Sequence, residues 1–441
     1  MATGQPEIDT IVAPATPPGR SALAIVRIDG PRSAEILSRL CGTDTPVRSA
    51  TLVRLTHNSQ LVDQCIAVRY EAPHSFTGND LVELTLHGSA VLVERLVRAA
   101  VDLGARLAEP GEFTERAVLS GKLDLVQAES IADVINSRTA LQASLSLANV
   151  EGSLSRKATA IRESLLHVIA RFEAALDFSE EGYEFIQRGE ARSILERAIA
   201  DAEALLETYR RGRATREGLN LVILGRPNAG KSTLLNRLVG TDRAIVTPIP
   251  GTTRDIVRET IEIGGLPVTL ADTAGLRESP DVVESIGVER ARRAAEASDV
   301  ILYLIDATAG MTDDDRRELD RWPDAWIIYS KSDLAPAPPG SVGISVVKEH
   351  GIDTLLSRLD AFVREHFVAP EGSLVNERQR RAVAECADAL RAAVASIDTG
   401  HDEQIIVVDL YRAATALGLL TGAITREDVF DEIFAKFCIG K

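Results

Sequence analysis

The sequence predicts a multidomain α/β protein: an N-terminal α/β domain, a discontinuous α-helical domain and an inserted P-loop domain with a mostly parallel sheet. Three observations support this. The chain has 441 residues, more than one hydrophobic core commonly organises. A phosphate-binding pattern occurs in mid-chain, at residues 225–232, between a strand pattern and a helix pattern. Stretches with helical periodicity flank the segment that holds this loop.

The composition is typical of a globular protein from a reducing compartment. The formal net charge is −16, so the surface is not basic overall, and a nucleic acid would need a local patch or a partner's surface. The cysteines have neither zinc nor redox spacing; they are Cys41, Cys65, Cys386 and Cys438. The sequence contains no run of eighteen apolar residues and no secretory signal, so we expect a cytoplasmic protein without a membrane partner.

Residues 1–118 are expected to form the N-terminal α/β domain. The segments 22–28, 64–70 and 81–86 are short, rich in Val, Ile and Leu, and bounded by Gly, Pro or Asp, which predicts strands. Residues 31–40 and 90–103 have the periodicity of helices.

Helical patterns dominate residues 119–215 and 371–441. Proline is absent between residues 120 and 215, and apolar residues recur at helical spacing. The expected helices cover residues 125–148, 154–178, 191–211, 376–397 and 405–420. We favour one helical domain interrupted by an inserted domain at residues 216–370, because neither stretch alone need close a core. Two separate helical domains are the alternative.

The loop at residues 225–232 has the sequence GRPNAGKS, which fits G-x-x-x-x-G-K-[ST]. It follows a buried-strand pattern at residues 219–224 and precedes a helix pattern at residues 233–239. Glycines allow backbone N–H groups to wrap the phosphates, and the helix N-terminus adds a favourable partial charge. We expect Lys231 to reach the terminal phosphates and the Ser232 hydroxyl to bind Mg²⁺.

Two further segments have the pattern of switch loops that respond to the γ-phosphate. Residues 272–275 (DTAG) follow an apolar strand at residues 266–270, where the Asp272 carboxylate can hold Mg²⁺ through water. Residues 251–255 (GTTRD) lie between the two motifs, and a threonine there can complete the Mg²⁺ shell. We favour Thr253 for this role, with Thr252 as the alternative.

The motifs do not identify the group that orients the attacking water. Leu276 stands where many small GTPases have glutamine, and an apolar side chain cannot orient water. Each nearby carboxylate is a solvated surface acid by default; these are Glu278, Asp281 and Glu284. The candidates for an arginine finger are Arg254 and Arg277.

Guanine recognition is expected from residues 330–333 (SKSD), which follow a strand pattern at residues 325–329. Asp333 can accept hydrogen bonds from guanine N1–H and the exocyclic amine, and adenine lacks both donors. Ser330 replaces the usual Asn of this motif, so we expect weaker nucleotide affinity more than altered specificity. Ser345 and Val346 stand where a Ser-Ala loop usually closes over the base.

With these motifs in place, the whole chain resembles the bacterial tRNA modification GTPases, of the TrmE-Era-EngA-EngB-Septin-like class, which install carboxymethylaminomethyl groups on wobble uridines. Outside the GTPase motifs, the resemblance is carried by residues 16–20 (TPPGR), 75–78 (SFTG), 87–88 (HG), 111–117 (GEFTERA), 122–125 (KLDL) and 438–441 (CIGK). A P-loop in mid-chain together with CIGK at residues 438–441 is the most specific part of this combination.

The resemblance implies an N-terminal folate-binding and dimerisation domain, a discontinuous helical domain and an inserted P-loop GTPase domain. It also implies a homodimer in which two GTPase domains meet across a bound K⁺ during hydrolysis, with K⁺ acting in place of an arginine finger. Asn228, Thr247, Ile249 and Thr252 match the family's K⁺ positions. Glu284 matches the family's catalytic position, alongside Lys231, which accounts for Leu276.

The motifs and the resemblance together imply a set of GTP contacts. These are Asn228, Ala229, Gly230, Lys231, Ser232, Thr233, Thr247, Pro248, Ile249, Pro250, Gly251, Thr252, Thr253, Asp272, Thr273, Ala274, Gly275, Lys331, Asp333 and Ser345. Mg²⁺ is assigned to Ser232 and Thr253.

The resemblance also implies a tetrahydrofolate derivative, in its 5-formyl or methylene form, as the one-carbon donor. Arg27, Glu83, Lys122 and Lys441 match the folate positions, where a carboxylate suits the pterin edge and cations suit the glutamyl tail. A flavin-dependent partner protein and tRNA complete the implied set of partners. Cys438 resembles a family cysteine, and a small buried thiol is the simpler interpretation.

A second hypothesis is a regulatory GTPase switch with no role in base modification. The folate positions and the CIGK tail favour the first hypothesis, because a generic switch needs neither of them.

Overall fold

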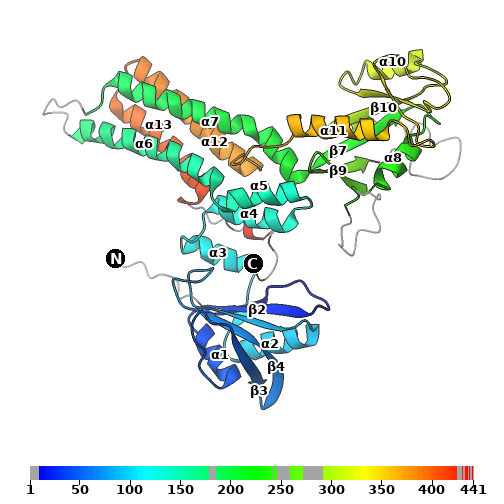
Figure 1. The fold of residues 1–441 in the computed structure, drawn as a ribbon. Coiled ribbons are helices and arrows are strands. Elements are labelled where there is room, and N and C mark those ends of the chain that lie inside the picture. Colours follow the sequence, from blue (N-terminus) through cyan, green and yellow to red (C-terminus); the bar gives the residue numbers. More distant parts are fainter. Residues whose placement is uncertain are drawn as a thin grey trace. The chain divides into compact units, whose positions relative to one another are not determined.

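The computed structural model describes residues 9–177, 185–241, 243–245, 259–271 and 292–424, and beyond these Phe430, residues 433–435, Phe437 and Gly440. The chain divides into two compact units. Unit 1 comprises Met1–Ala132, Val150–Ala191 and Ala392–Lys441, and unit 2 comprises Asp133–Asn149 and Arg192–Arg391. Each unit is built from segments far apart in sequence, and each contains a six-stranded sheet (Figure 1).

The sheet of unit 1 has the strand order β3-β4-β5-β2-β1-β6. Its strands are β1 (Ile11–Pro14), β2 (Leu23–Asp29), β3 (Thr51–His57), β4 (Gln60–Tyr70), β5 (Leu81–His87) and β6 (Arg106–Leu107). Neighbouring strands are antiparallel, except that β6 runs parallel to β1. The predicted strands at residues 22–28, 64–70 and 81–86 are confirmed as β2, β4 and β5. The strands β1, β3 and β6 are not among those predicted from the sequence.

Side chains along these strands point alternately to the two faces of the sheet, and the two faces pack against different helices. Val26, Ile28 and Leu84 are buried in one core with α1 (Ser33–Cys41) and α2 (Ala90–Asp102). The opposite face packs Ile11 and Ala13 against Phe113 of α3 (Glu112–Leu119). Because side chains alternate along a strand, Arg27 and Glu83 are expected on the face away from α1 and α2.

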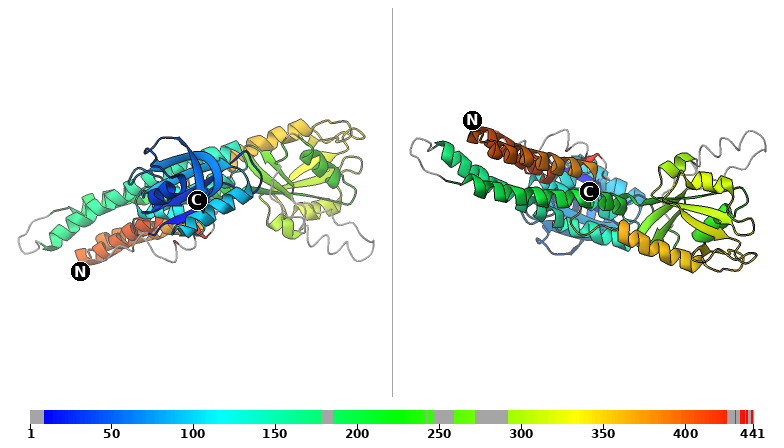
Figure 2. Two further views of the ribbon diagram at one scale, coloured as in Figure 1. Left: turned by 90° about the horizontal axis from the view of Figure 1, so that it is seen from below. Right: turned by 90° about the horizontal axis from the view of Figure 1, so that it is seen from above.

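Long helices form the rest of unit 1. They are α6 (Ser153–Asp177), α13 (Glu403–Thr421) and most of α4 (Leu125–Asn136). α6 and α13 lie side by side (Figures 1 and 2). Among the described helices, α13 is the one long and apolar enough to cross a membrane by length and composition, and half of its apolar window is buried inside the protein. A core helix of a bundle has this same character.

The single helix predicted at residues 125–148 is wrong, because α4 ends at Asn136 and α5 (Ala140–Val150) starts after a short break. Ser137 Oγ donates to the Asp133 carbonyl oxygen at 2.7 Å, at the end of α4. The Gln142 backbone N–H donates to Thr139 Oγ1 at 3.3 Å, at the start of α5. These side chains bond to backbone groups that a helix end leaves without partners, so a break is tolerated inside an apolar pattern.

The sheet of unit 2 has the strand order β12-β11-β10-β7-β9-β8. Its strands are β7 (Leu219–Gly225), β8 (Glu259–Ile263), β9 (Leu266–Ala271), β10 (Val300–Asp306), β11 (Trp326–Ser330) and β12 (Val342–Gly343). All neighbours are parallel except the β8–β9 hairpin. The remaining helices are α7 (Arg188–Glu217, which begins in unit 1), α8 (Lys231–Val239), α10 (Asp313–Leu319), α11 (Ile352–His366) and α12 (Glu377–Asp398). The predicted α/β multidomain class with a mostly parallel sheet is confirmed.

Candidate nucleotide site

The candidate nucleotide site lies at one edge of the unit 2 sheet. Because β7, β10, β11 and β12 are parallel, their carboxyl ends share this edge. Ligands of open α/β sheets bind outside the carboxyl ends of the strands. The phosphate-binding loop follows β7, the SKSD segment begins at the end of β11, and Ser345 follows β12. The fold therefore gathers segments that are more than 100 residues apart in sequence.

The loop after β7 has a backbone that needs its glycines. Gly225 has a φ of +137°, and a Cβ there would lie 2.3 Å from the carbonyl oxygen of Leu304 in β10. Gly230 has a φ of +92° and is the N-cap of α8. Asn228 also adopts the left-handed region, with a φ of +64°, which Asn tolerates better than most residues. This backbone is a cradle that an added side chain at Gly225 would deform.

Lys231 begins α8, and its ammonium group turns back into the loop. Its Nζ donates to the carbonyl oxygens of Gly225 at 2.8 Å and Arg226 at 2.9 Å. Burial lowers the pKa of Lys231. A phosphate beside this ammonium would favour its charged form. Ser232 and Thr233 follow in the first turn of α8 and are exposed, so their hydroxyl groups are accessible at the same helix end.

Ser330 ties the end of β11 to the phosphate-binding loop. Its side chain is buried, and its Oγ lies 2.7 Å from the Ala229 carbonyl oxygen and 3.2 Å from the Ile305 carbonyl oxygen. In the sequence, Ser330 stands where this motif usually has Asn. The structure shows that the serine side chain, although shorter than that of Asn, links the SKSD segment to β10 and to the phosphate-binding loop.

Lys331 pairs with Asp306, a residue that was not predicted to belong to the site. Its Nζ lies 2.6 Å from Asp306 Oδ2 at the end of β10. Burial raises the pKa of Asp306, but the hydrogen bonds from Lys331 and Thr308 outweigh it, and the pKa lies below its ordinary value. The one feature of the sequence that could have indicated Asp306 is its position at the carboxyl end of a parallel strand. The pairing itself depends on β10 and β11 being neighbours.

The SKSD segment and the loop at Ser345, both expected to contact the guanine base, are joined through the backbone. The Ser332 N–H donates to the Ile344 carbonyl oxygen at 3.0 Å, and Ser345 exchanges two 2.9 Å backbone hydrogen bonds with His350. Ser345 is buried, Asp333 is exposed, and Val346 is partly buried. The structure thus brings Lys331 and Ser345 into neighbouring loops and leaves the Asp333 carboxylate accessible.

We expect Ser330→Ala to weaken the binding of GDP and GTP by about 2- to 10-fold, the equivalent of one net hydrogen bond. The loop would lose its side-chain link to β11, while the glycines and Lys231 would remain. Titration of a fluorescent GDP analogue measures the effect. Ser341→Ala, an exposed serine of the same unit, is the matched control. An unchanged Kd in folded Ser330→Ala would show that the bridge does not support nucleotide binding.

The predicted folate positions Arg27 and Glu83 lie opposite each other on β2 and β5. Arg27 Nε lies 2.8 Å from Glu83 Oε1, and the Arg27 guanidinium sits 5.4 Å from the centre of the Phe76 ring. Tyr70 donates to Glu83 Oε2 at 3.5 Å. An ion pair with two aromatic neighbours thus occupies the face of the sheet that α1 and α2 leave free.

Lys122, a third predicted folate position, and Gly440 can also be located in unit 1. A Cβ on Gly78, two residues after Phe76, would lie 3.5 Å from Cγ of the exposed Lys122. A Cβ on Gly440 would lie 2.0 Å from the Pro14 carbonyl oxygen, next to the β1 residue that pairs with Arg27. Gly78 therefore lies against the segment that carries Lys122, and Gly440 lies against the end of β1.

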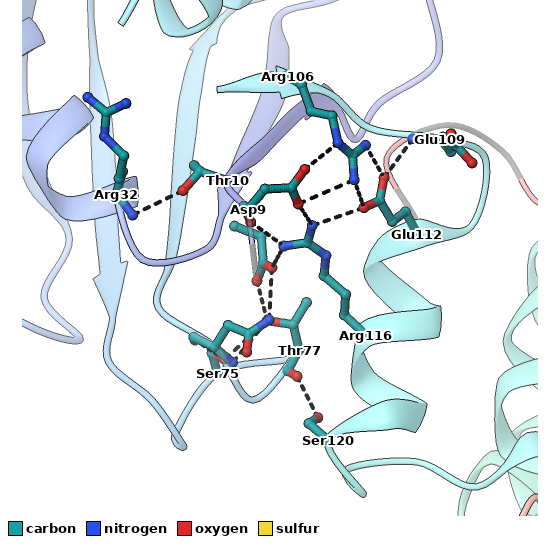
Figure 3. Close-up of polar contacts among 12 residues, drawn as sticks. Asp9, Thr10, Arg32, Ser75, Thr77, Arg106, Glu109, Glu112, Arg116 and Ser120 are labelled. Carbon is teal, nitrogen blue, oxygen red and sulfur yellow. Dashed lines mark hydrogen bonds and ion pairs between the residues drawn. The ribbon is translucent and has the colours of Figure 1, made fainter. Parts of the chain in front are cut away.

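Two of the motifs that carried the resemblance form an ion-pair network (Figure 3). Arg116 of the GEFTERA motif binds Asp29 at 2.9 Å, Asp9 at 2.6 Å and Glu112 at 2.9 Å. Asp29 is fully buried and also accepts hydrogen bonds from Thr77 of the SFTG motif and from Asn79. Arg106 adds further bonds to Asp9 and Glu112. These motif residues hold α3 to the sheet.

Several predicted residues lie outside the described part of the chain. They are Thr247, Pro248, Ile249, Pro250, Gly251, Thr252, Thr253, Arg254, Asp272, Thr273, Ala274, Gly275, Leu276, Arg277, Glu278, Asp281, Glu284, Cys438 and Lys441. Their roles stay predictions.

Two family models match the chain. Residues 10–122 match the model described as GTP-binding protein TrmE N-terminus, and residues 125–438 match the MnmE helical domain. The chain is 40% identical to the tRNA modification GTPase MnmE of Symbiobacterium thermophilum, covering 98% of this chain and 99% of that protein. It is 39% identical to the same enzyme of Moorella thermoacetica and 41% identical to that of Azoarcus sp., again over 98% of this chain and at least 98% of each relative.

A likeness of this extent covers every segment described above, including both sheets and the long helices. The chain therefore belongs to the family of the tRNA modification GTPase MnmE and is a GTP hydrolase that acts in tRNA modification.

Proposed function

We propose that this protein is a K⁺-stimulated GTPase that, with a flavin-dependent partner protein, adds a carboxymethylaminomethyl-type group to C5 of the wobble uridine of certain tRNAs. A tetrahydrofolate derivative supplies the one-carbon unit. The observation that carries the proposal is the combination, in one chain, of the loop cradle around Lys231 with the Arg27–Glu83 pair of the N-terminal sheet. A regulatory switch needs the first of these and has no use for the second.

The nucleotide site fits GTP with two cations. The cradle at Gly225 and the helix end at Lys231 suit phosphates, and the exposed Ser232 hydroxyl suits Mg²⁺. Bound Mg²⁺ and K⁺ would neutralise the charge that develops on the phosphates during hydrolysis. In our proposal Lys231 stabilises the same charge, Thr253 completes the Mg²⁺ shell, and Glu284 assists the attacking water.

The N-terminal site fits a folate. The Glu83 carboxylate can accept from the N–H donors of a pterin edge, and Tyr70 and Phe76 supply flat apolar surface beside it. Lys122 and Lys441 would bind the glutamyl tail. In this arrangement the Arg27 guanidinium orients the Glu83 carboxylate, whose oxygens accept hydrogen bonds from N–H donors.

The proposal includes a homodimer through the N-terminal domain, cytoplasmic location and working domain borders at residues 118, 215 and 370. Dimerisation would bring two GTPase domains together across K⁺. The K⁺ ligands proposed are Asn228, Thr247, Ile249 and Thr252. Asn228 suits this role because it lies in the loop that contains Lys231, where it has a left-handed backbone and an exposed side chain.

We expect GTP hydrolysis to be about tenfold faster, or more, in KCl than in NaCl of equal ionic strength, because one cation stabilises the transition state. Initial rates of phosphate release measure the difference, and Asn228→Ala should abolish it. Equal rates in both salts would refute the K⁺ part of the proposal and leave the GTPase activity itself intact.

Mass spectrometry of tRNA nucleosides tests the modification itself. A strain without this gene should lack the modified wobble uridines, and expression of the wild-type chain should restore them. Arg27→Ala should fail to restore them while its GTP hydrolysis stays near the wild-type rate. Normal wobble uridines in the deletion strain would favour the regulatory switch.

A further inference from the structure

Two dense arginine runs of this acidic chain lie in unit 2. Four of the seven residues 210–216 and three of the four residues 378–381 are arginine. The first run lies near the end of α7 and the second at the start of α12, and these helices lie side by side (Figure 2). The Arg380 guanidinium is 5.8 Å from the centre of the Tyr209 ring, and Arg391 pairs with Glu203 at 2.7 Å farther along.

Carboxylates balance only part of this charge. Glu377 is shared by Arg380 at 2.6 Å and Arg381 at 2.9 Å. Arg213 pairs with Glu217 at 2.9 Å, and Arg216 pairs with Asp133 at 2.7 Å.

Arg210 and Arg211 are both exposed, and within the described residues neither pairs with a carboxylate. The seven arginines of the two runs therefore exceed their partner carboxylates, in a chain whose net charge is −16.

A cleft of about 310 Å³ adjoins these arginines, lined by α7 and the amino-terminal edge of the unit 2 sheet. Tyr209, Arg210, Arg213 and Phe367 form part of its wall. The Arg210 guanidinium lies 5.8 Å from the centre of the Phe367 ring, which positions its charge at the cleft. The two acids in the wall already have partners: Glu217 binds Arg213, and Asp299 accepts from the Asn220 N–H at 2.9 Å.

This cleft is separate from the nucleotide site. It includes Leu219 at the start of β7, whereas the phosphate-binding loop begins at Gly225, where β7 ends. A strand of this length spans about 20 Å. A ligand of the cleft is therefore not the hydrolysed nucleotide.

We propose that the arginine surface, defined as Arg210, Arg211 and Arg213 with the adjoining cleft, binds tRNA. The guanidinium groups contact phosphates, and the cleft takes an unstacked base beside Tyr209. RNA offers phosphates together with flat bases, which matches exposed arginines combined with aromatic walls. An acidic protein segment would satisfy the charge but has no use for the aromatic cleft. The inference rests on the proposed function, because it identifies where this chain contacts its tRNA.

The test compares two double variants of the full-length protein. Arg210→Ala/Arg211→Ala removes the unpaired charges. Arg358→Ala/Arg364→Ala is the matched control, because these α11 arginines are also exposed and, in the described part of the chain, have no carboxylate partner. Fluorescence anisotropy with an unmodified tRNA transcript is measured from 50 to 200 mM KCl.

We expect the first variant to bind tRNA about tenfold more weakly, with a salt slope reduced by about two, while the control binds like the wild type. GTP hydrolysis without tRNA should be unchanged in both, which shows that they fold. Tyr209→Ala should weaken the binding of a single-stranded RNA more than the binding of a blunt RNA duplex.

Equal tRNA affinity and salt slope in the wild type and the first variant would overturn the inference. The inference would also be overturned if the protein bound polyglutamate through Arg210 and Arg211 but did not bind tRNA. That result would indicate a protein partner. Neither result would alter the outcome of the nucleoside analysis, so the proposed function is tested separately.

Discussion

Lys231→Ala is expected to reduce the rate of GTP hydrolysis by at least about 10²–10³-fold, the loss found when one preorganised donor to a developing charge is removed. Lys231 is the first residue of α8, and its ammonium group is held by two loop carbonyl oxygens within 2.9 Å. Alanine keeps the helix, since it is the best helix former, but it provides no cation for the phosphates. Phosphate release under saturating GTP measures the effect.

Lys157→Ala in α6 is the control for this experiment, because Lys157 is exposed and belongs to unit 1. It should hydrolyse GTP like the wild type. If Lys231→Ala retained more than a tenth of the wild-type rate, the catalytic role of Lys231 would have to be abandoned. The loop would then act only as a backbone cradle.

Arg116→Met is expected to destabilise the N-terminal sheet and α3 by about 3–5 kcal/mol. Among the described residues, Arg116 is the one cation that pairs with Asp29, whose side chain is fully buried. Methionine fills a similar volume but leaves this carboxylate without its charge partner. Hydrogen exchange of backbone amides in β1 and β2 measures the free energy of unfolding of this part alone.

The same network predicts a pH dependence. Burial raises the pKa of Glu112, but hydrogen bonds and charges from Arg106 and Arg116 outweigh it, so the pKa lies below its ordinary value. The pKa of Asp9 is lowered in the same balance. A lowered pKa in the folded state stabilises the fold above the ordinary pKa, and this contribution is lost as the pH falls below about 4.5.

Arg98→Ala is the control for Arg116→Met. Arg98 pairs with Glu94 at 2.7 Å on the exposed face of α2, and such surface pairs contribute about 0.5 kcal/mol. It should leave amide exchange nearly unchanged. Equal exchange in Arg116→Met and the wild type would mean that the network does not hold α3 to the sheet.

Much of the nucleotide site could be predicted from local patterns. The loop, its strand and its helix are contiguous, so G-x-x-x-x-G-K-[ST] specifies them together. The parallel order of β7, β10 and β11 follows from alternating strands and helices. The resemblance correctly identified the family, because its motifs extend over the whole chain.

Other features could not be predicted because they join residues far apart in sequence. In the sequence, Ser330 is visible only as a departure from the usual Asn. Its hydrogen bond to the Ala229 carbonyl oxygen forms only when β11 lies beside β10. The Lys331–Asp306 pair has the same origin. The GEFTERA and SFTG motifs identified the family without indicating that Arg116 and Thr77 meet on Asp29. The break between α4 and α5 depends on side-chain hydrogen bonds that an apolar period does not register.

By itself, the sequence determined the fold class, the phosphate-binding loop and the family, because strand and helix periods, glycine requirements and motif spacing are local properties. Only the tertiary structure decided which distant side chains meet: Ser330 with the loop, Arg27 with Glu83, and Tyr209 of α7 with Arg380 of α12. The physical reason is that hydrogen bonds and ion pairs act over about 3 Å, and chain folding alone brings residues a hundred positions apart to that distance.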